Sequence, residues 1–247
     1  YTTAPSSAGV PIVTKFDVNS KPARNTVAEV YTQVISDLTK AISLAKFNQG
    51  QTMNFTLTAK TRALNSSFMT KYAAATVLAR VYQHKGDWAN AKATALDVIA
   101  NSGFSLVTSS NVISYWKGAA PLTGKVETMF EVTSDANNQV GDGTLAVFLI
   151  GKPGGGAYGD MLATKAFYDT YTTTDTRKGL ISPEVRSGQL GTAHYVAKYP
   201  IDNVNLDDVK VVRFSEAYLI LAEAYYNLGD IANANATLNK FVNDIFF

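Results

Sequence analysis

The chain is 247 residues long and 46% apolar, which is enough to bury a sizeable core in one domain or two lobes. Its formal net charge of +2 is small and its basic residues are scattered, so the charge pattern gives no support for nucleic-acid binding. The absence of cysteine excludes disulfide bonds and thiol chemistry, and with only His84 and His194 available we expect neither a metal site nor a cofactor. The longest apolar run is broken by Glu223 and is too short to cross a bilayer.

The N-terminal quarter of the chain predicts one helix between two irregular segments. The first 24 residues contain three prolines and predict an extended stretch on the surface. Residues 24–46 repeat apolar side chains at i, i+3 and i+4, which predicts an amphipathic helix capped by Asn25 or Thr26. Residues 47–66 are mostly polar and predict a loop.

A helical hairpin is predicted twice, at residues 72–101 and again near the C-terminus. The shared positions include Leu78/Leu221, Tyr82/Tyr225, Gly86/Gly229 and Asp87/Asp230, with several alanines between them. In each copy we expect the glycine to end the first helix and the aspartate to cap the second. One hairpin cannot bury its own apolar face, so we expect the copies to pack on each other or on something else. Trp88 takes the place of Ile231 at the turn and is predicted to pack there.

Between the hairpins lies an insertion, residues 104–211, that holds most of the glycines. Two loops, TSSNVISYWKGAAPLTG and GKPGGGAYGD, carry aromatic residues, and loops of this kind often bind ligands. The insertion predicts strands at 126–133, 145–150 and 194–199, and a helical pattern at 159–171. The chain therefore reads as a helical scaffold, 25–103 and 212–247, carrying one irregular insertion.

Several blocks of sequence carry a family resemblance. They are VPIV at residues 10–13, Arg24 with VYTQVISDL at 30–38, AA at 73–74 with LARVY at 78–82, DTR at 175–177, and VRFSEAYLILAEA at 212–224. In this order they resemble the SusD/RagB family of outer-membrane glycan-binding lipoproteins of Bacteroidetes-type bacteria. The hairpins resemble tetratricopeptide repeats, although regular arrays repeat at much shorter spacing. The resemblance implies a mostly α, SusD-like fold: a helical hairpin scaffold with a loop-rich insertion containing a few short β-strands.

The same resemblance implies a function and a location. Proteins of this family are not enzymes; they bind oligosaccharide or polysaccharide and pass it to a TonB-dependent, SusC-like transporter for nutrient uptake. The implied place is the extracellular face of the outer membrane, with membrane contact only through an N-terminal lipid anchor. The family's anchor cysteine, first helices and C-terminal part have no counterpart in these residues, so we expect one domain that is incomplete at both ends.

Sugar binding requires flat aromatic faces beside amide and charged groups. Tyr115 and Trp116 meet that requirement, next to Asn111 and Lys117, and so does Tyr158 beside a run of three glycines. We predict these five residues as the ligand-binding set, with no catalytic residue. The alternative for each aromatic is simple core packing, which is the commoner role in a chain with 13 Tyr and 12 Phe.

Other charged residues fit structural roles better than catalysis. Glu127, Glu131 and Asp135 surround one predicted strand, and one strand cannot place two carboxylates across a cleft, so we expect them to be solvated or ion-paired. We expect Asp175 and Arg177 to form a structural pair or cap. Arg213, Glu216 and Glu223 are expected to bridge the stacked helices.

Two other function classes stay open alongside glycan binding. A tetratricopeptide-like scaffold would grip a peptide or protein partner through its hairpins, with the aromatics of the insertion buried. A glycoside hydrolase would need two carboxylates facing one cleft. The GKPGGGAYGD loop lacks the Lys-Ser/Thr ending of a phosphate-binding loop and predicts a turn.

Overall fold

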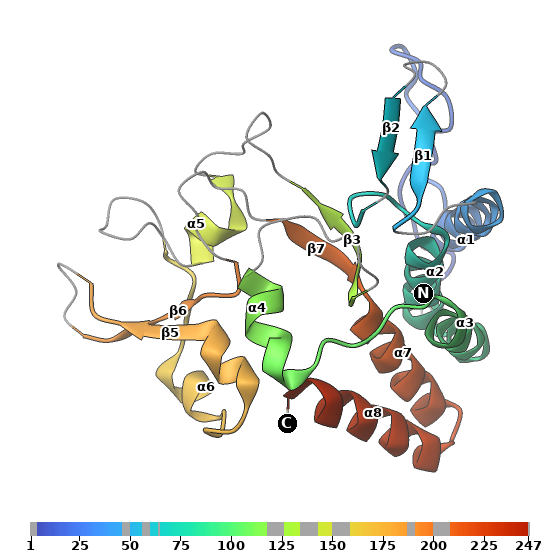
Figure 1. Cartoon of the computed structure of the whole chain (residues 1–247). Helices are drawn as coiled ribbons and strands as arrows, with labels where there is room; N and C mark the ends of the chain where they lie inside the picture. Colours follow the sequence, from blue (N-terminus) through green and yellow to red (C-terminus); the bar gives the residue numbers. More distant parts are fainter. Residues whose placement is uncertain are drawn as a thin grey trace.

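The structure is a computed structural model. It describes residues 4–45, 50–55, 60–63, 65–117, 126–133, 143–149, 159–186, 191–199 and 208–246. The long helices from the two ends of the chain gather on one side of the molecule, and an irregular part with short helices and strands extends from them (Figure 1). The predicted mostly α class is confirmed, with few and short strands in the described residues.

Helix α1 (Val27–Leu44) forms where the apolar spacing predicts a helix, and it packs against α2 (Lys71–Lys85). Thr26 is the cap: its hydroxyl accepts the N–H of Glu29, whose carboxylate accepts the N–H of Thr26 in return. Arg24 donates to the carbonyls of Ala8 and Gly9, which ties the extended N-terminal segment to the start of this helix.

The predicted loop at 47–66 is wrong in its centre. Strands β1 (Thr52–Phe55) and β2 (Lys60–Ala63) form an antiparallel hairpin there. The reason lies in the alternation of TMNF and in its threonine, since β-branched residues favour strands even when the stretch is polar overall.

Both helical hairpins are confirmed. Helices α2 and α3 (Trp88–Asn101) form the first, and α7 (Phe214–Asn227) and α8 (Ile231–Phe246) form the second. Gly86 and Gly229 adopt φ values of 77° and 82°, the left-handed conformation that glycine adopts without strain. Asp87 accepts the N–H of Asn90 at the start of α3. The equivalent aspartate of the second hairpin does the same, as the repeat predicts.

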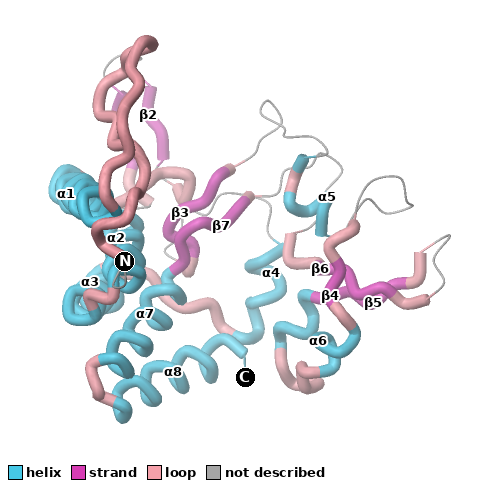
Figure 2. The backbone as a smooth tube through the Cα atoms, turned by 180° about the vertical axis from the view of Figure 1, so that it is seen from behind, coloured by secondary structure: helices cyan, strands magenta, loops and turns pink. Residues whose placement is uncertain are grey.

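The two hairpins stack directly on each other through α3 and α7 (Figures 1 and 2). Their contact is made of small and branched residues that are almost fully buried, namely Ala79, Ala91, Ala95, Ile220, Leu221 and Ala224. Trp88 packs against this cluster, as predicted. Arg80 makes a bidentate ion pair with Glu216, and Gln83 donates to Glu223, so polar groups also join α2 to α7.

The insertion has more helix than its sequence predicts. Its described elements are η1 (Ser109–Asn111), α4 (Val112–Lys117), β3 (Thr128–Val132), α5 (Leu145–Leu149), β4 (Leu162–Ala163), α6 (Lys165–Asp169), η3 (Thr176–Leu180), β5 (Ile181–Glu184), β6 (Ala193–Val196) and β7 (Val209–Arg213). The strand predictions at 126–133 and 194–199 are confirmed. The strand predicted at 145–150 is wrong: that short apolar run forms α5, because such a run fits a buried helix as well as a strand.

Strand β7 connects the insertion to the second hairpin. It pairs antiparallel with β3 and leads without a break into α7, while β4, β6 and β5 form a separate sheet (Figure 2). One buried cluster contains Phe104 and Met129 of the insertion together with Tyr72, Val98 and Phe214 of the hairpins. The hairpins and the insertion therefore share a core, and their division into scaffold and insertion describes the order of segments along the chain. No helix in the described ranges has the length and apolarity to span a membrane.

Candidate functional site

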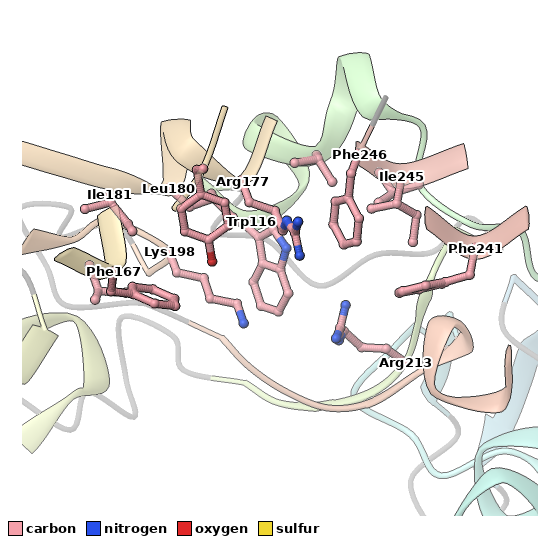
Figure 3. Close-up of a pocket in the computed structure, with 14 residues that line it drawn as sticks. Trp116, Phe167, Arg177, Leu180, Ile181, Lys198, Arg213, Phe241, Ile245 and Phe246 are labelled. Atoms are coloured by element: carbon pink, nitrogen blue, oxygen red, sulfur yellow. The ribbon is translucent and has the colours of Figure 1, made fainter. Parts of the chain in front are cut away.

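A pocket of about 240 Å³ lies where the insertion meets the end of α8 (Figure 3). Its apolar wall includes Val107, Val112, Leu180, Phe241, Ile245 and Phe246. Trp116 of α4 lies at its centre, and the nitrogen-bearing ends of Arg177, Lys198 and Arg213 gather around it (Figure 3). We call this cavity the Trp116 pocket. No Asp or Glu lines it among the described residues, so its charged groups are all cationic.

Trp116 is held rigidly by its neighbours. Its ring meets those of Tyr115 and Tyr199 edge-on, with centroids 5.4 and 5.9 Å apart, and the whole residue is only 6% exposed. The ammonium of Lys198 lies 3.7 Å from the centroid of the Trp116 ring, and the guanidinium of Arg213 lies 4.9 Å from it. The ammonium of Lys210 lies 5.5 Å from the same centroid. All three distances fall within cation–π range, so three cations surround one indole.

A buried carboxylate fixes Arg213. Glu127 is 0% exposed, and its Oε1 accepts a hydrogen bond from Nη1 of Arg213 at 2.6 Å. Its other oxygen accepts the backbone N–H of Val107 at 3.2 Å. Glu131, on β3, is also buried; it accepts from Ser66 and lies 4.0 Å from the ammonium of Lys210. The expectation that Glu127 and Glu131 are ion-paired is confirmed, and Asp135 lies outside the described residues.

Lys198 is the least compensated cation of the pocket. Burial first, and then the positive charges of Arg213 and Lys210, lower its pKa to about 8, against the opposing charge of Glu127. The pKa of Lys210 is lowered for the same first reason, which is burial. With a pKa of about 8, Lys198 remains mostly protonated at neutral pH, so it keeps its positive charge in the pocket.

Arg177 closes the pocket on the side of η3. It pairs with Asp175 at 2.6 Å, and its guanidinium lies 4.0 Å from the ring centroid of Phe246 and 5.1 Å from that of Tyr171. The hydrogen bond from Arg177 lowers the pKa of Asp175, which also caps η3 by accepting the N–H of Arg177. The predicted structural pair is confirmed. Arg213, by contrast, pairs with Glu127 and does not bridge the helices.

A second, more open hollow of about 560 Å³ adjoins the Trp116 pocket. Phe167 and Val196 line both cavities, so they form the border between them. Phe167 is 50% exposed, and its ring meets that of Tyr171 edge-on at 5.3 Å. Met161 and Leu162 of the second hollow are also exposed. The site is therefore a partly open pocket that continues past a solvent-facing aromatic ring into a shallower, mostly apolar groove.

The predicted binding residues do not form the surface platform that the sequence indicates. Residues 109–117 form η1 and α4 in place of a loop, and this turns Tyr115 and Trp116 inward. Tyr115 is 9% exposed and its hydroxyl bonds to that of Thr128 at 2.6 Å; burial raises its pKa. Asn111 and Lys117 lie on the exposed side of the same segment. Of the set, Trp116 alone is among the described residues that line the pocket.

Tyr158 lies outside the described residues. His194 is buried, with its ring centroid 4.9 Å from that of Tyr168, which fits a packing role. The described part of the chain contains no group of three or more His, Cys, Asp or Glu residues placed to hold a metal ion.

Sequence reasoning missed Phe167 and Lys198. The pocket draws its walls from α4, α6, η3, β5, β6, β7 and α8, which are far apart along the chain. No local motif marks Lys198, which follows β6 and is one lysine among many. Phe167 was part of a predicted helix, and only the structure shows that α6 presents its ring to solvent.

Comparisons with known proteins agree with this architecture. The tetratricopeptide repeat family matches residues 216–244, which form the second hairpin. A Bacteroides vulgatus structure provisionally named as a sugar binding protein is 31% identical, with a TM-score of 0.77 over 97% of this chain and 50% of its own. A SusD superfamily protein from Bacteroides thetaiotaomicron is 26% identical, with a TM-score of 0.81 over 98% of this chain and 52% of its own.

A third structure shares the fold at lower identity. It is a SusD-like carbohydrate binding protein from Bacteroides vulgatus, 20% identical, with a TM-score of 0.78 over 100% of this chain and 50% of its own. The chain thus spans about half the length of these solved proteins. Comparison with curated protein sequences found no match.

Proposed function

Because this chain has the fold of the SusD superfamily, we propose that it binds glycans at the outer face of the cell and delivers them to a SusC-like, TonB-dependent transporter. Sugar binding is the function named for two of the similar structures. The transporter, the outer-membrane location and the lipid anchor rest on the family resemblance. Because that family binds without catalysis, the proposed activity is recognition and hand-over, with no cofactor.

One observation carries the proposal: a half-exposed aromatic ring, Phe167, lies between the Trp116 pocket and a more open groove. Aromatic faces pack against the CH surfaces of sugar rings, and the apolar walls on either side continue that surface. The groove of about 560 Å³ falls within the roughly 300–1,000 Å³ usual for ligand sites, and the Trp116 pocket is slightly smaller. An oligosaccharide can place one residue in the pocket and its neighbours along the groove.

The predicted residues take supporting positions in this proposal. Trp116 forms the floor of the pocket and orients the cations above it. Asn111, at the end of η1, and Lys117, at the end of α4, are exposed and can offer hydrogen bonds to hydroxyl groups of a longer chain. Tyr115 supports Trp116 from below through its edge-on contact.

The two tryptophans of the chain make a direct test possible. Trp88 belongs to the hairpin stack, and Trp116 belongs to the pocket. In a Trp88→Phe variant all tryptophan fluorescence comes from Trp116, and in a Trp116→Phe variant it all comes from Trp88. We expect a panel of plant, host and storage glycans to include at least one that changes the emission of the first variant and leaves that of the second unchanged.

The panel also has outcomes that contradict the proposal. If no glycan changes the emission or releases heat with the intact protein, glycan binding is refuted. If a glycan releases heat but changes neither tryptophan, the function stands and the site lies elsewhere. Both variants are conservative in size, and circular dichroism checks that each is folded.

A protein-interaction scaffold is the second candidate, and the repeat match at 216–244 favours it. The tip of the second hairpin exposes Tyr226, Leu228 and Ile231 by 65%, 47% and 47%. The opposite face of α7 is occupied, because it is buried against α3. This candidate predicts a partner that binds the hairpin tip and is lost in Tyr226→Ser, with no response to any glycan.

A glycoside hydrolase has less support from the described residues. Glu127 and Glu131 are both buried and hydrogen-bonded, and neither lines the pocket. Release of reducing sugar that disappears in Glu131→Gln would revive this class.

A further inference from the structure

We propose that the Trp116 pocket selects acidic glycans and that Lys198 and Arg213 bind the carboxylate of a uronic acid residue. This inference rests on the proposed glycan-binding function and adds the ligand class. It begins from the uneven charge of the cavity: three cationic side chains line it and no acidic residue does among the described ones, although the whole chain carries only +2.

The three cations differ in how far their charge is already neutralised. Arg177 is paired with Asp175, and Arg213 is paired with Glu127. Lys198 rests on the face of Trp116 at 3.7 Å, beside the like charge of Arg213, and takes part in none of the ion pairs found within the described ranges. Burial and the nearby second cation both disfavour the positive charge of Lys198. A bound anion would compensate that cost.

The N–H groups of Arg213 and Lys198 are suited to binding a carboxylate. The guanidinium of Arg213 uses Nη1 toward Glu127, and its fork carries further N–H groups on the other edge. Lys198 has three N–H donors, none of which is replaced by the cation–π contact with Trp116. The ends of both side chains lie beside the Trp116 ring (Figure 3), so we expect one carboxylate to accept a charge-assisted hydrogen bond from each of them.

The apolar wall restricts what can carry that carboxylate. Leu180, Phe241 and Ile245 surround the cations, and the volume of about 240 Å³ leaves room for a compact ring rather than a large headgroup. Phe167 at the border provides the aromatic face for the next ring. A uronic acid within an oligosaccharide combines one carboxylate, an apolar ring face and a continuing chain, which matches the three parts of the site.

The test uses pairs of glycans that differ only in charge. Oligogalacturonides, alginate oligosaccharides and hyaluronan oligosaccharides are each compared with their carboxyl-reduced forms, which keep the chain and lose the negative charge. By calorimetric titration of the intact protein at low salt we expect at least one acidic form to bind about tenfold or more tighter than its reduced partner. The preference should shrink as salt is raised, because charges screen each other.

Two lysine variants assign the preference to the pocket. Lys198→Gln should lose most of the preference for the acidic form: its affinity for the acidic glycan should fall about tenfold, and its affinity for the reduced glycan should not change. Lys198→Arg should restore the preference. Lys40→Gln is the matched control, since Lys40 is an exposed residue of α1, and α1 lies far from α4 and α6 (Figure 1). The affinities of Lys40→Gln should equal those of the wild type.

Separate outcomes refute the inference and the function on which it rests. Equal binding of acidic and reduced forms, or an acidic preference that survives in Lys198→Gln, overturns the acidic-ligand proposal and leaves glycan binding in place. No binding of any acidic, reduced or neutral glycan contradicts the proposed function, and the inference with it.

Discussion

Replacing Glu127 by glutamine should destabilise the fold severely, although it changes one atom. The carboxylate of Glu127 is 0% exposed and is the ion-pair partner of Arg213 at 2.6 Å. The glutamine amide keeps an acceptor for the N–H of Val107 but carries no charge. Arg213 is then left beside Lys198 and Lys210 without the carboxylate that pairs with it. Removing one partner of a buried pair costs about 3–5 kcal/mol.

The side chain of Arg213 is 31% exposed, so water recovers part of that loss. We therefore expect Glu127→Gln to lower the free energy of unfolding by about 2–3 kcal/mol. The assay is urea unfolding followed by circular dichroism, with the slope compared between variants to confirm that one transition is measured.

The single variant Arg213→Met and the double variant Glu127→Gln/Arg213→Met complete a double-mutant cycle. Since the double variant removes both charges, its loss should be clearly smaller than the sum of the two single losses. A loss below about 0.5 kcal/mol for Glu127→Gln, or simple additivity in the double variant, refutes the argument that this pair is a buried unit.

Three further predictions concern the hairpins and the pocket. Ala224 is 0% exposed in the stack, so Ala224→Leu should cost about 1–3 kcal/mol of unfolding free energy by urea titration, and a neutral result would contradict the close packing. Gly229 has φ +82°, and a Cβ added there would meet no other atom, so Gly229→Ala should cost about 1–2 kcal/mol through its backbone alone, and Gly229→Asn should cost less. The pKa of Lys198 is lowered to about 8, so affinity for an acidic oligosaccharide should be constant below that pH and fall as pH rises above it. Lys198 is faced by Arg213, Lys210 and Glu127, and of these only Lys210 is another lysine with a lowered pKa. Calorimetry of Lys198→Gln should show no such fall, and a fall of the same size in that variant would assign the effect to Lys210.

The hairpins were predictable because their signals are local. A glycine in the left-handed conformation, an aspartate one residue later and alanines at helical spacing all act within a few residues of each other. The stack of α3 on α7 follows from the same pattern, since two apolar faces of small residues need a partner.

The site was not predictable to the same degree, because its parts meet only in three dimensions. Tyr115 and Trp116 were chosen as an exposed pair in a loop, but α4 turns both inward. Whether a short segment folds as a loop or as one and a half helical turns depends on what covers it, and here Tyr199 and Phe241, from distant segments, supply that cover. Lys198 reaches Trp116 only because β6 ends beside α4.

The central claim is that a glycan binds across Phe167, and substituting that ring tests it most directly. Phe167 is 50% exposed, so Phe167→Ala should leave the fold intact, and Phe16→Ala, at a residue that is 92% exposed in the N-terminal segment, is the matched control. With the glycan that binds most tightly to the wild type, calorimetry should show the affinity of Phe167→Ala reduced about tenfold, the scale of one aromatic contact and its buried area. The Phe16→Ala affinity should match that of the wild type. Equal affinity for Phe167→Ala and the wild type would contradict the proposed site, and absence of binding by any glycan would contradict the proposed function.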